Sequence, residues 1–218
     1  NLSKLQQGKH TCGTITKIIN FADSLFVFQQ KGIGVINYNE KGLIDTSEGQ
    51  ISVGNSGVVN GIKYLSTNNG CLNRHCICST NTQVVYLDSE TMSFNGVGSN
   101  GIVDISSTYG MKTFFKNDIY QQLTTDSNGN FNDNGSLIQF DKINNELHII
   151  SNTDDLCYDC LSNSFMTFFD YEHTWFIDNF YKHYLYHNNV LWEREAGDYN
   201  RFFGIIKPHY MEVLFNGD

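Results

Sequence analysis

Short apolar runs alternate with polar turns through residues 136–169, and this spacing predicts strands rather than helices. The turns between the runs are rich in Asn, Asp and Ser. The paired Asn144 and Asn145 tolerate the positive φ that a tight hairpin requires. We therefore predict four antiparallel strands that follow one another as a meander: Leu137–Phe140, Leu147–Ile150, Leu156–Asp159 and Phe165–Phe169.

A single four-stranded meander leaves two faces and two edges uncovered, so it is stable only when it is stacked on similar sheets. Stacked meanders of this size are the blades of a β-propeller. We expect an all-β fold of repeated four-stranded antiparallel meanders, β-propeller-like and either complete or partial, with one short helical insertion. Residues 1–218 are expected to form a single domain that is a fragment of a longer chain.

A weak internal repeat supports stacked units. The segment Val85–Phe94 aligns with Leu156–Phe165, and each has an apolar strand, an Asp, a polar turn and a Phe. Asp88 and Asp159 are the matched residues, and an Asp at a strand end can accept hydrogen bonds from the backbone of the following turn. The spacing between the copies is long for one blade, and residues 95–135 are predicted to be the insertion. It would hold a strand and a short helix over 102–117 and a polar loop over 121–135.

The rest of the chain yields weaker expectations. Residues 42–70 are rich in Gly, Ser and Asn and are predicted to be a long connection with one short strand at Ile62–Leu65. Asn188 and Asn189 predict a two-residue hairpin in the last unit, residues 174–203. Further strands are expected at Cys12–Ile19, Leu25–Phe28, Ile33–Ile36, Arg74–Ser79 and Val84–Asp88.

Composition and charge exclude several functional classes. The net charge is −9 and no basic patch is visible, so direct nucleic-acid binding is not expected. No run of eighteen apolar residues exists, so no membrane span is expected. The six cysteines fit no compact disulfide framework, and reduced thiols are the expected state.

A zinc site is the first candidate for chemistry. Cys76, Cys78, Cys157 and Cys160, with His75 or His148, offer enough ligands for a tetrahedral site. Their spacing does not match two CxxC pairs on turns, so buried free thiols are the favoured interpretation. The expected metal and cofactor content is none.

Three further patterns resemble known sites, and each has a simpler explanation. Residues 126–133 echo a calcium loop but lack the bidentate Glu, and a solvated loop is favoured. Ser56 and His10 resemble a serine-protease pair but lie too close in sequence. Glu193, Glu195 and Asp198 could serve glycoside hydrolysis, although basic neighbours favour a charged turn. We therefore expect no catalytic residues and no enzyme activity.

Aromatic residues are dense near the carboxyl end of the chain. They could stack on sugars, although aromatic residues more often fill blade cores and subunit interfaces. A receptor- or glycan-binding propeller module, with possible contact to a host-surface glycan, is therefore the alternative function. The residues concerned are Phe176, Phe180, Tyr181, Tyr184, Tyr186 and Trp192.

Several phrases taken in order resemble the muzzle proteins of crAss-like bacteriophages, and more loosely the propeller-containing tail hub proteins of podoviruses. They lie mainly between Tyr64 and the chain end: Tyr64–Cys71, Val85–Asp88, Asp104–Ser106, Tyr109–Phe115 and Gly197–Gly204. None of these phrases is a catalytic signature.

The resemblance implies a virion structural protein of the phage tail that is assembled in the bacterial host cytoplasm. Its expected partners are further copies of itself in a ring-like homo-oligomer and other tail proteins. Its expected function is subunit packing in the muzzle or tail hub assembly rather than catalysis.

Overall fold

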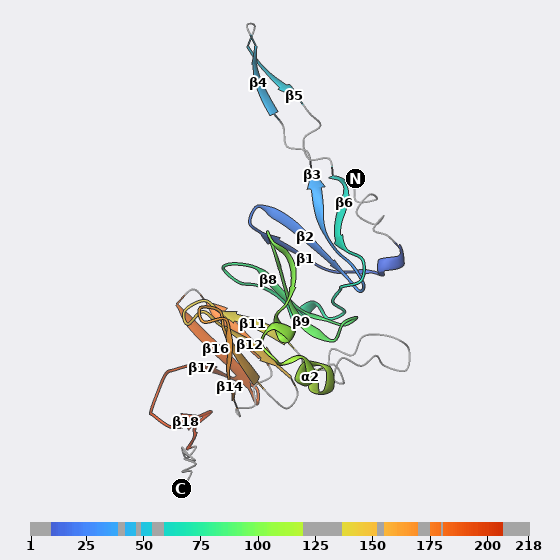
Figure 1. The fold of residues 1–218 in the computed structure, drawn as a ribbon. Coiled ribbons are helices and arrows are strands. Elements are labelled where there is room, and N and C mark those ends of the chain that lie inside the picture. The colour runs from blue at the N-terminus through green and yellow to red at the C-terminus, as the bar shows by residue number, and fades with distance from the viewer. Residues whose placement is uncertain are drawn as a thin grey trace.

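The computed structural model describes residues 10–38, 42–46, 49–53, 59–119, 137–151, 155–169, 175–179 and 181–206. Most of these residues lie in antiparallel strands that form three four-stranded sheets and one three-stranded sheet (Figure 1). The expectation of a mostly β fold built from several four-stranded antiparallel sheets is confirmed. Among the described residues, no helix is both long and apolar enough to cross a membrane.

Sheet one has the strand order β1-β2-β3-β6 and is preceded by a short 3-10 turn, η2 (His10–Cys12). Because this turn occupies the start of the predicted strand Cys12–Ile19, the strand begins at Ile15 instead. The predicted hairpin over residues 25–36 is confirmed by the pairing of β2 with β3. The four strands are β1 (Ile15–Phe21), β2 (Ser24–Gln29), β3 (Ile33–Tyr38) and β6 (Val59–Ser66).

The long connection predicted over residues 42–70 is wrong in part, because it contains two additional strands. β4 (Gly42–Thr46) and β5 (Gly49–Val53) form an antiparallel hairpin that extends away from the sheets in Figure 1. Its many Gly and Ser residues lower the β-propensity of the segment. The apolar residues Ile44 and Ile51 are nevertheless directly paired across the hairpin.

Sheet two has the order β10-β9-β8-β7, and its two central strands are almost fully buried. Residues 74–76, predicted as part of a strand, form the 3-10 turn η3 (Arg74–Cys76), in which Asn73 Oδ1 accepts a hydrogen bond from the His75 N–H. The strands are β7 (Ile77–Ser79), β8 (Val84–Asp88), β9 (Ser93–Gly98) and β10 (Gly101–Asp104).

The helices of the chain follow β10 directly. Asp104 caps the first of them by accepting a hydrogen bond from the Ser107 N–H at 2.8 Å, because the first turn of a helix has unpaired N–H groups. The expectation of a strand and then a short helix over residues 102–117 is therefore confirmed. The helical segments are α1 (Ile105–Thr108), α2 (Lys112–Phe114) and the π-helical η4 (Phe115–Ile119).

Sheet three is the meander predicted first from the sequence, with the order β11-β12-β13-β14. Its turn after β11 places Asn145 at a positive φ of 58°, as the paired asparagines predict. The strands are β11 (Leu137–Asp141), β12 (Glu146–Ile150), β13 (Asp155–Asp159) and β14 (Ser164–Phe169).

The matched roles predicted for Asp88 and Asp159 are confirmed, and Asp141 is a third example. The carboxylate of Asp88 accepts hydrogen bonds from the N–H groups two and three residues later, at 2.8 and 3.2 Å. Asp159 accepts the equivalent pair at 2.8 and 3.2 Å, and Asp141 at 2.8 and 3.0 Å. A residue at positive φ closes each turn: Met92 (54°), Asn145 (58°) and Asn163 (53°).

Sheet four has three strands, β15 (Trp175–Asn179), β16 (Lys182–His187) and β17 (Val190–Glu193). The predicted two-residue hairpin is confirmed, because Asn188 and Asn189 both have positive φ, 49° and 62°. A separate short hairpin follows, formed by β18 (Arg201–Phe202) and β19 (Ile205–Ile206).

One apolar core connects sheets one, two and three, while sheet four has a small cluster of its own. Aromatic pairs join neighbouring sheets in the large core. The rings of Phe28 and Tyr86 are 5.3 Å apart, and those of Phe94 and Tyr158 are 6.0 Å apart. The second cluster consists of the buried Phe176 and Leu185, and Phe169 of β14 packs against it, so an apolar contact already links sheet four to sheet three.

Candidate functional site

A group of buried and partly buried ionisable side chains lies between sheets three and four. It forms because the ends of β11 and β12 carry polar residues on the side that faces β16 and the residue after β17. We call it the inter-sheet cluster, and its members are Asp141, Glu146, His148, Asp155, His183 and Arg194.

Arg194 is the centre of the inter-sheet cluster. Its Nη1 lies 2.8 Å from Oδ2 of Asp141 and 3.0 Å from Nε2 of His148, and its Nη2 lies 3.4 Å from Oε2 of Glu146. The side chain is 13% exposed and that of Asp141 is fully buried. One guanidinium from sheet four therefore contacts three residues of sheet three, and its several donors suit such shared contacts.

The partners of His148 favour one tautomer of its ring. Arg194 can only donate hydrogen bonds, so Nε2 of His148 must be unprotonated to accept one. The proton then lies on Nδ1, which is 3.2 Å from both carboxylate oxygens of Asp155. The ring of His148 is stacked on Phe176 at 5.3 Å.

Asp141 and His183 form the second half of the cluster. Nε2 of His183 lies 2.7 Å from Asp141, and Nδ1 lies 3.4 Å from Asp178. Burial by itself would raise the pKa of Asp141, but the hydrogen bonds from Asn144 and the charges of His183 and Arg194 hold that pKa below its ordinary value. Asp141 is therefore ionised at neutral pH.

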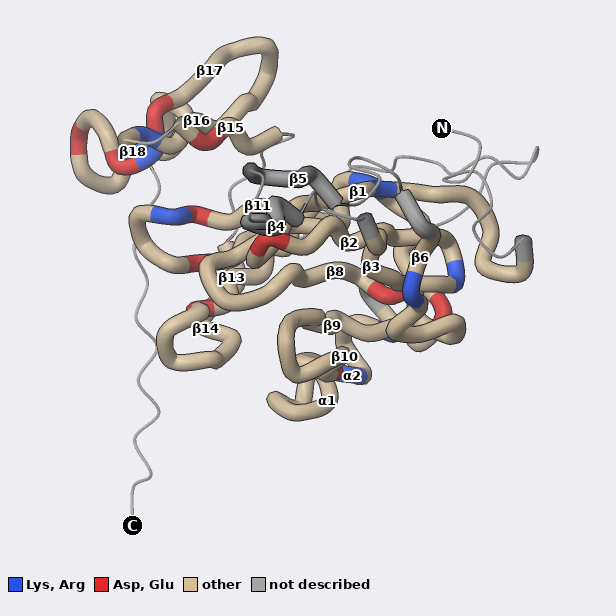
Figure 2. Tube along the Cα trace, turned by 90° about the horizontal axis from the view of Figure 1, so that it is seen from above, with Lys and Arg blue, Asp and Glu red and all other residues tan. Residues whose placement is uncertain are grey.

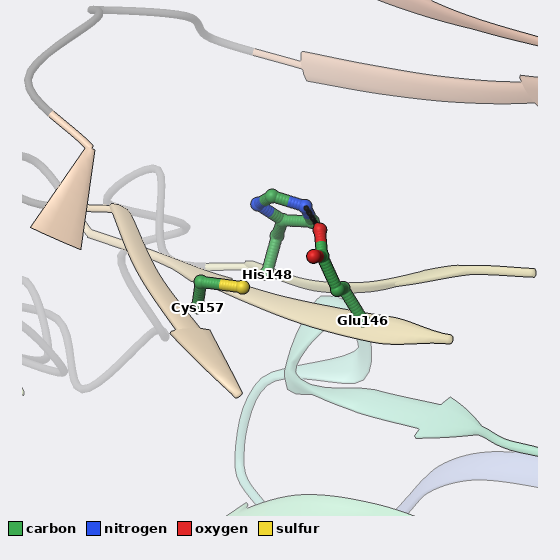
Figure 3. Close-up of side chains that lie close together, drawn as sticks. All are labelled: Glu146, His148 and Cys157. Carbon is green, nitrogen blue, oxygen red and sulfur yellow. Dashed lines mark ion pairs between the residues drawn. The ribbon is translucent and has the colours of Figure 1, made fainter. Parts of the chain in front are cut away.

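Glu146, His148 and Cys157 lie close enough together to be considered as metal ligands. Their ligand atoms are all within 4.8 Å of one another, and Figure 3 shows the three side chains converging from neighbouring strands. The site does not suit a cation, because the guanidinium of Arg194 already lies against both Glu146 and His148. Burial, with the charges of Glu146 and Asp155, also raises the pKa of Cys157 to about 12, whereas zinc binds the thiolate.

The residues that the sequence suggested for zinc are thus only partly brought together. Of those six, His148 and Cys157 lie in the group of potential ligands, and Glu146 joins them there. Glu146 could have been found from the sequence, because it precedes His148 by two positions on one strand and so shares its face. The other four are distributed over η3, β7 and the turn after β13: His75, Cys76, Cys78 and Cys160.

The remaining sequence candidates are separated or lie outside the described residues. The calcium-like segment 126–133, Ser56 and Phe180 fall outside, whereas His10 lies in η2. Each acidic residue of the proposed hydrolase group has a basic partner: Glu193 with Lys182 at 2.8 Å, Glu195 with Arg194 at 3.8 Å and Asp198 with Arg201 at 3.6 Å.

The aromatic residues that the structure describes near the carboxyl end do not form a common surface. Phe176 is buried against His148, and Trp192 packs edge-on against Phe203 at 5.8 Å. Tyr181 is 86% exposed, and Tyr186 is 37% exposed. These four residues therefore divide between the interior of sheet four and its outer surface.

Comparisons with known proteins agree on one family. The family model of the Crassvirus muzzle protein matches residues 9–190. The chain is also 29% identical over 212 residues to the "Muzzle protein" of Bacteroides phage crAss001. That alignment covers 94% of this chain and 15% of the relative, so the chain spans a small part of the relative's length. On the strength of the family match over most of its residues, this chain belongs to the Crassvirus muzzle protein family.

Proposed function

We propose that this chain is a structural part of the phage tail, in the muzzle or tail hub assembly, and that it holds neighbouring subunits together rather than catalysing a reaction. Membership of the muzzle family supports a phage structural role. The same proposal places it in the virion tail, assembled in the host cytoplasm from several copies of itself and other tail proteins.

We further propose that the sheets are successive propeller-like blades around one axis. The first strands of all four sheets support this arrangement, because β1, β7, β11 and β15 contribute residues to the lining of a single cavity. In a propeller, the first strand of every blade lies nearest the axis. The remaining blades would come from sequence beyond these residues, since closed propellers have about four to eight blades.

The observation that carries the packing role is the exposure of β17. The third strands of the four-stranded sheets two and three, β9 and β13, are almost entirely buried. β17 is also the third strand of its sheet, but Val190 and Leu191 are 47% and 51% exposed. Among the residues that the structure describes, sheet four thus has no fourth strand at the position where sheets two and three have one.

The backbone of β17 is suited to pairing with another strand. The Arg194 N–H donates to the carbonyl of His183 at 2.8 Å. This bond shows which residue pairs of β16 and β17 are hydrogen-bonded to each other and which are not. Alternate residues of an antiparallel strand direct their backbone groups to one neighbour. Trp192 therefore faces β16, while Leu191 and Glu193 direct their N–H and C=O groups outward, where an unpaired edge favours the addition of a strand. We assign this edge to a strand from a neighbouring copy in the assembly.

A charge placed on the edge tests this proposal. Leu191→Lys should weaken assembly, because a lysine on an edge strand opposes strand addition. The matched control is Leu161→Lys, in the turn after β13, where the leucine is 73% exposed. Light scattering should give oligomers for the parent protein and the control, and smaller species for Leu191→Lys. Unchanged assembly of Leu191→Lys, or a monomeric parent protein, would contradict the proposed packing role.

A further inference from the structure

A cavity of about 220 Å³ lies where the first strands of the four sheets meet. Its walls combine apolar side chains with a few polar groups, which is the usual composition of a ligand site. The polar residues come from three different sheets and include Lys17 of β1, Ser79 of β7 and Gln139 of β11. His75 and Trp175 form an aromatic wall, with their rings edge-to-face at 5.0 Å.

Lys17 is the charged group of this cavity. Its Nζ donates a hydrogen bond to the carbonyl of Ile77 at 2.6 Å, which uses one of the three N–H donors of an ammonium. Among the described residues, no carboxylate lies within ion-pair distance of Lys17. A partly buried charge without an opposite charge is destabilising.

The missing counter-charge is not explained by a shortage of acidic residues. The chain has 23 Asp and Glu residues against 14 Lys and Arg residues, and Figure 2 shows acidic positions spread over the sheets. Burial lowers the pKa of Lys17, and nearby cysteines act in the opposite direction. A carboxylate bound beside the ammonium would raise that pKa again and stabilise the charged form.

We propose that this cavity binds a carboxylate group, which pairs with the ammonium of Lys17 while His75 and Trp175 contact the attached carbon atoms. The cavity is smaller than the roughly 300–1,000 Å³ of sites for drug-sized ligands. It therefore suits a small carboxylic acid or the end of one Asp or Glu side chain inserted by a neighbouring protein.

Fluorescence of Trp175 measures this binding. The chain has two tryptophans, so a Trp192→Phe background leaves Trp175 as the reporter. Acetate and N-acetylglutamate amide are titrated against chloride at equal ionic strength. At least one of the two carboxylates should give a saturable change in the Trp192→Phe protein and in the control Lys63→Met, whose lysine is exposed on β6. Neither carboxylate should give a change in Lys17→Met.

The two ligands distinguish the two sources of the carboxylate. Binding of both supports a site open to free acids, and binding of the glutamate derivative alone supports an inserted side chain. Absence of both, or an identical titration in Lys17→Met, would overturn the proposal. NMR of the unsubstituted protein adds a test that does not depend on the variants: acetate should raise the pKa of Lys17, and an unmoved titration would contradict the pairing.

Discussion

Replacing Arg194 by Met should weaken the attachment of sheet four to sheet three. Methionine keeps the apolar stem of the side chain but removes the guanidinium. The substitution leaves Asp141 fully buried and removes the group 2.8 Å from its carboxylate. It also removes the donor 3.0 Å from Nε2 of His148 and the group 3.4 Å from Oε2 of Glu146, so three groups of sheet three lose a partner at once.

The expected cost is about 3 kcal/mol in the free energy of unfolding, the lower end of the roughly 3–5 kcal/mol found when one partner of a buried ion pair is removed. The lower end applies because Asp141 keeps the hydrogen bonds from the N–H groups of Ile143 and Asn144, at 2.8 and 3.0 Å. With an m-value of about 2 kcal/mol per M in urea, the unfolding midpoint should fall by about 1.5 M.

Urea unfolding followed by circular dichroism measures the midpoint, and hydrogen exchange locates the effect. Exchange should accelerate first in β15, β16 and β17. The matched control is Lys182→Met, which breaks the ion pair with Glu193 at 2.8 Å, where the two side chains are 50% and 35% exposed. Exposed pairs contribute little, so its midpoint should move far less. The reasoning is refuted if Arg194→Met and Lys182→Met have the same midpoint, or if sheet four exchanges no faster.

Three further predictions follow from the described contacts. The pKa of Asp141 is lowered in the folded protein. The ionised carboxylate therefore contributes stability at pH values above its ordinary pKa of 3.8, and this contribution is lost as the pH falls through the pKa of the folded state. Asp141→Asn should weaken the dependence of the melting temperature on acid pH. Asp88→Ala should cost about 1–3 kcal/mol, because the buried Asn95 amide and the buried Gly70 N–H lose their acceptor. Asp159→Ala in an exposed turn should cost clearly less in parallel urea titrations. Cys157, with a pKa of about 12, should resist a thiol reagent at pH 8 until the protein unfolds, and rapid labelling of the native protein in peptide mass spectrometry would contradict its burial.

Local patterns predict the meanders well, because the signals that define them are local. Alternation of apolar runs and turn residues identifies sheet three, and the resemblance of Val85–Phe94 to Leu156–Phe165 identifies the shared turn of Asp88 and Asp159. Asp141 makes the same turn, but the sequence around it differs from the other two copies, and the paired asparagines are the stronger indication of a turn there.

The inter-sheet cluster could not be predicted in the same way. Asp141 and Arg194 come into contact only because sheets three and four are packed together, and their spacing in the sequence does not predict that contact. The hairpin of β4 and β5 is hard to predict for a different reason, because its Gly and Ser content obscures the apolar pair of Ile44 and Ile51. The cavity around Lys17 likewise depends on four strands that are far apart in the chain.

Cryo-electron microscopy of intact virions of a phage that carries this protein tests the central claim most directly. A structural role in the muzzle or tail hub predicts density for these sheets in the tail, repeated around its axis, with a strand of a neighbouring subunit paired to β17. Tails that lack density for this domain would contradict the structural role, and density with an unpaired β17 would contradict the proposed edge contact.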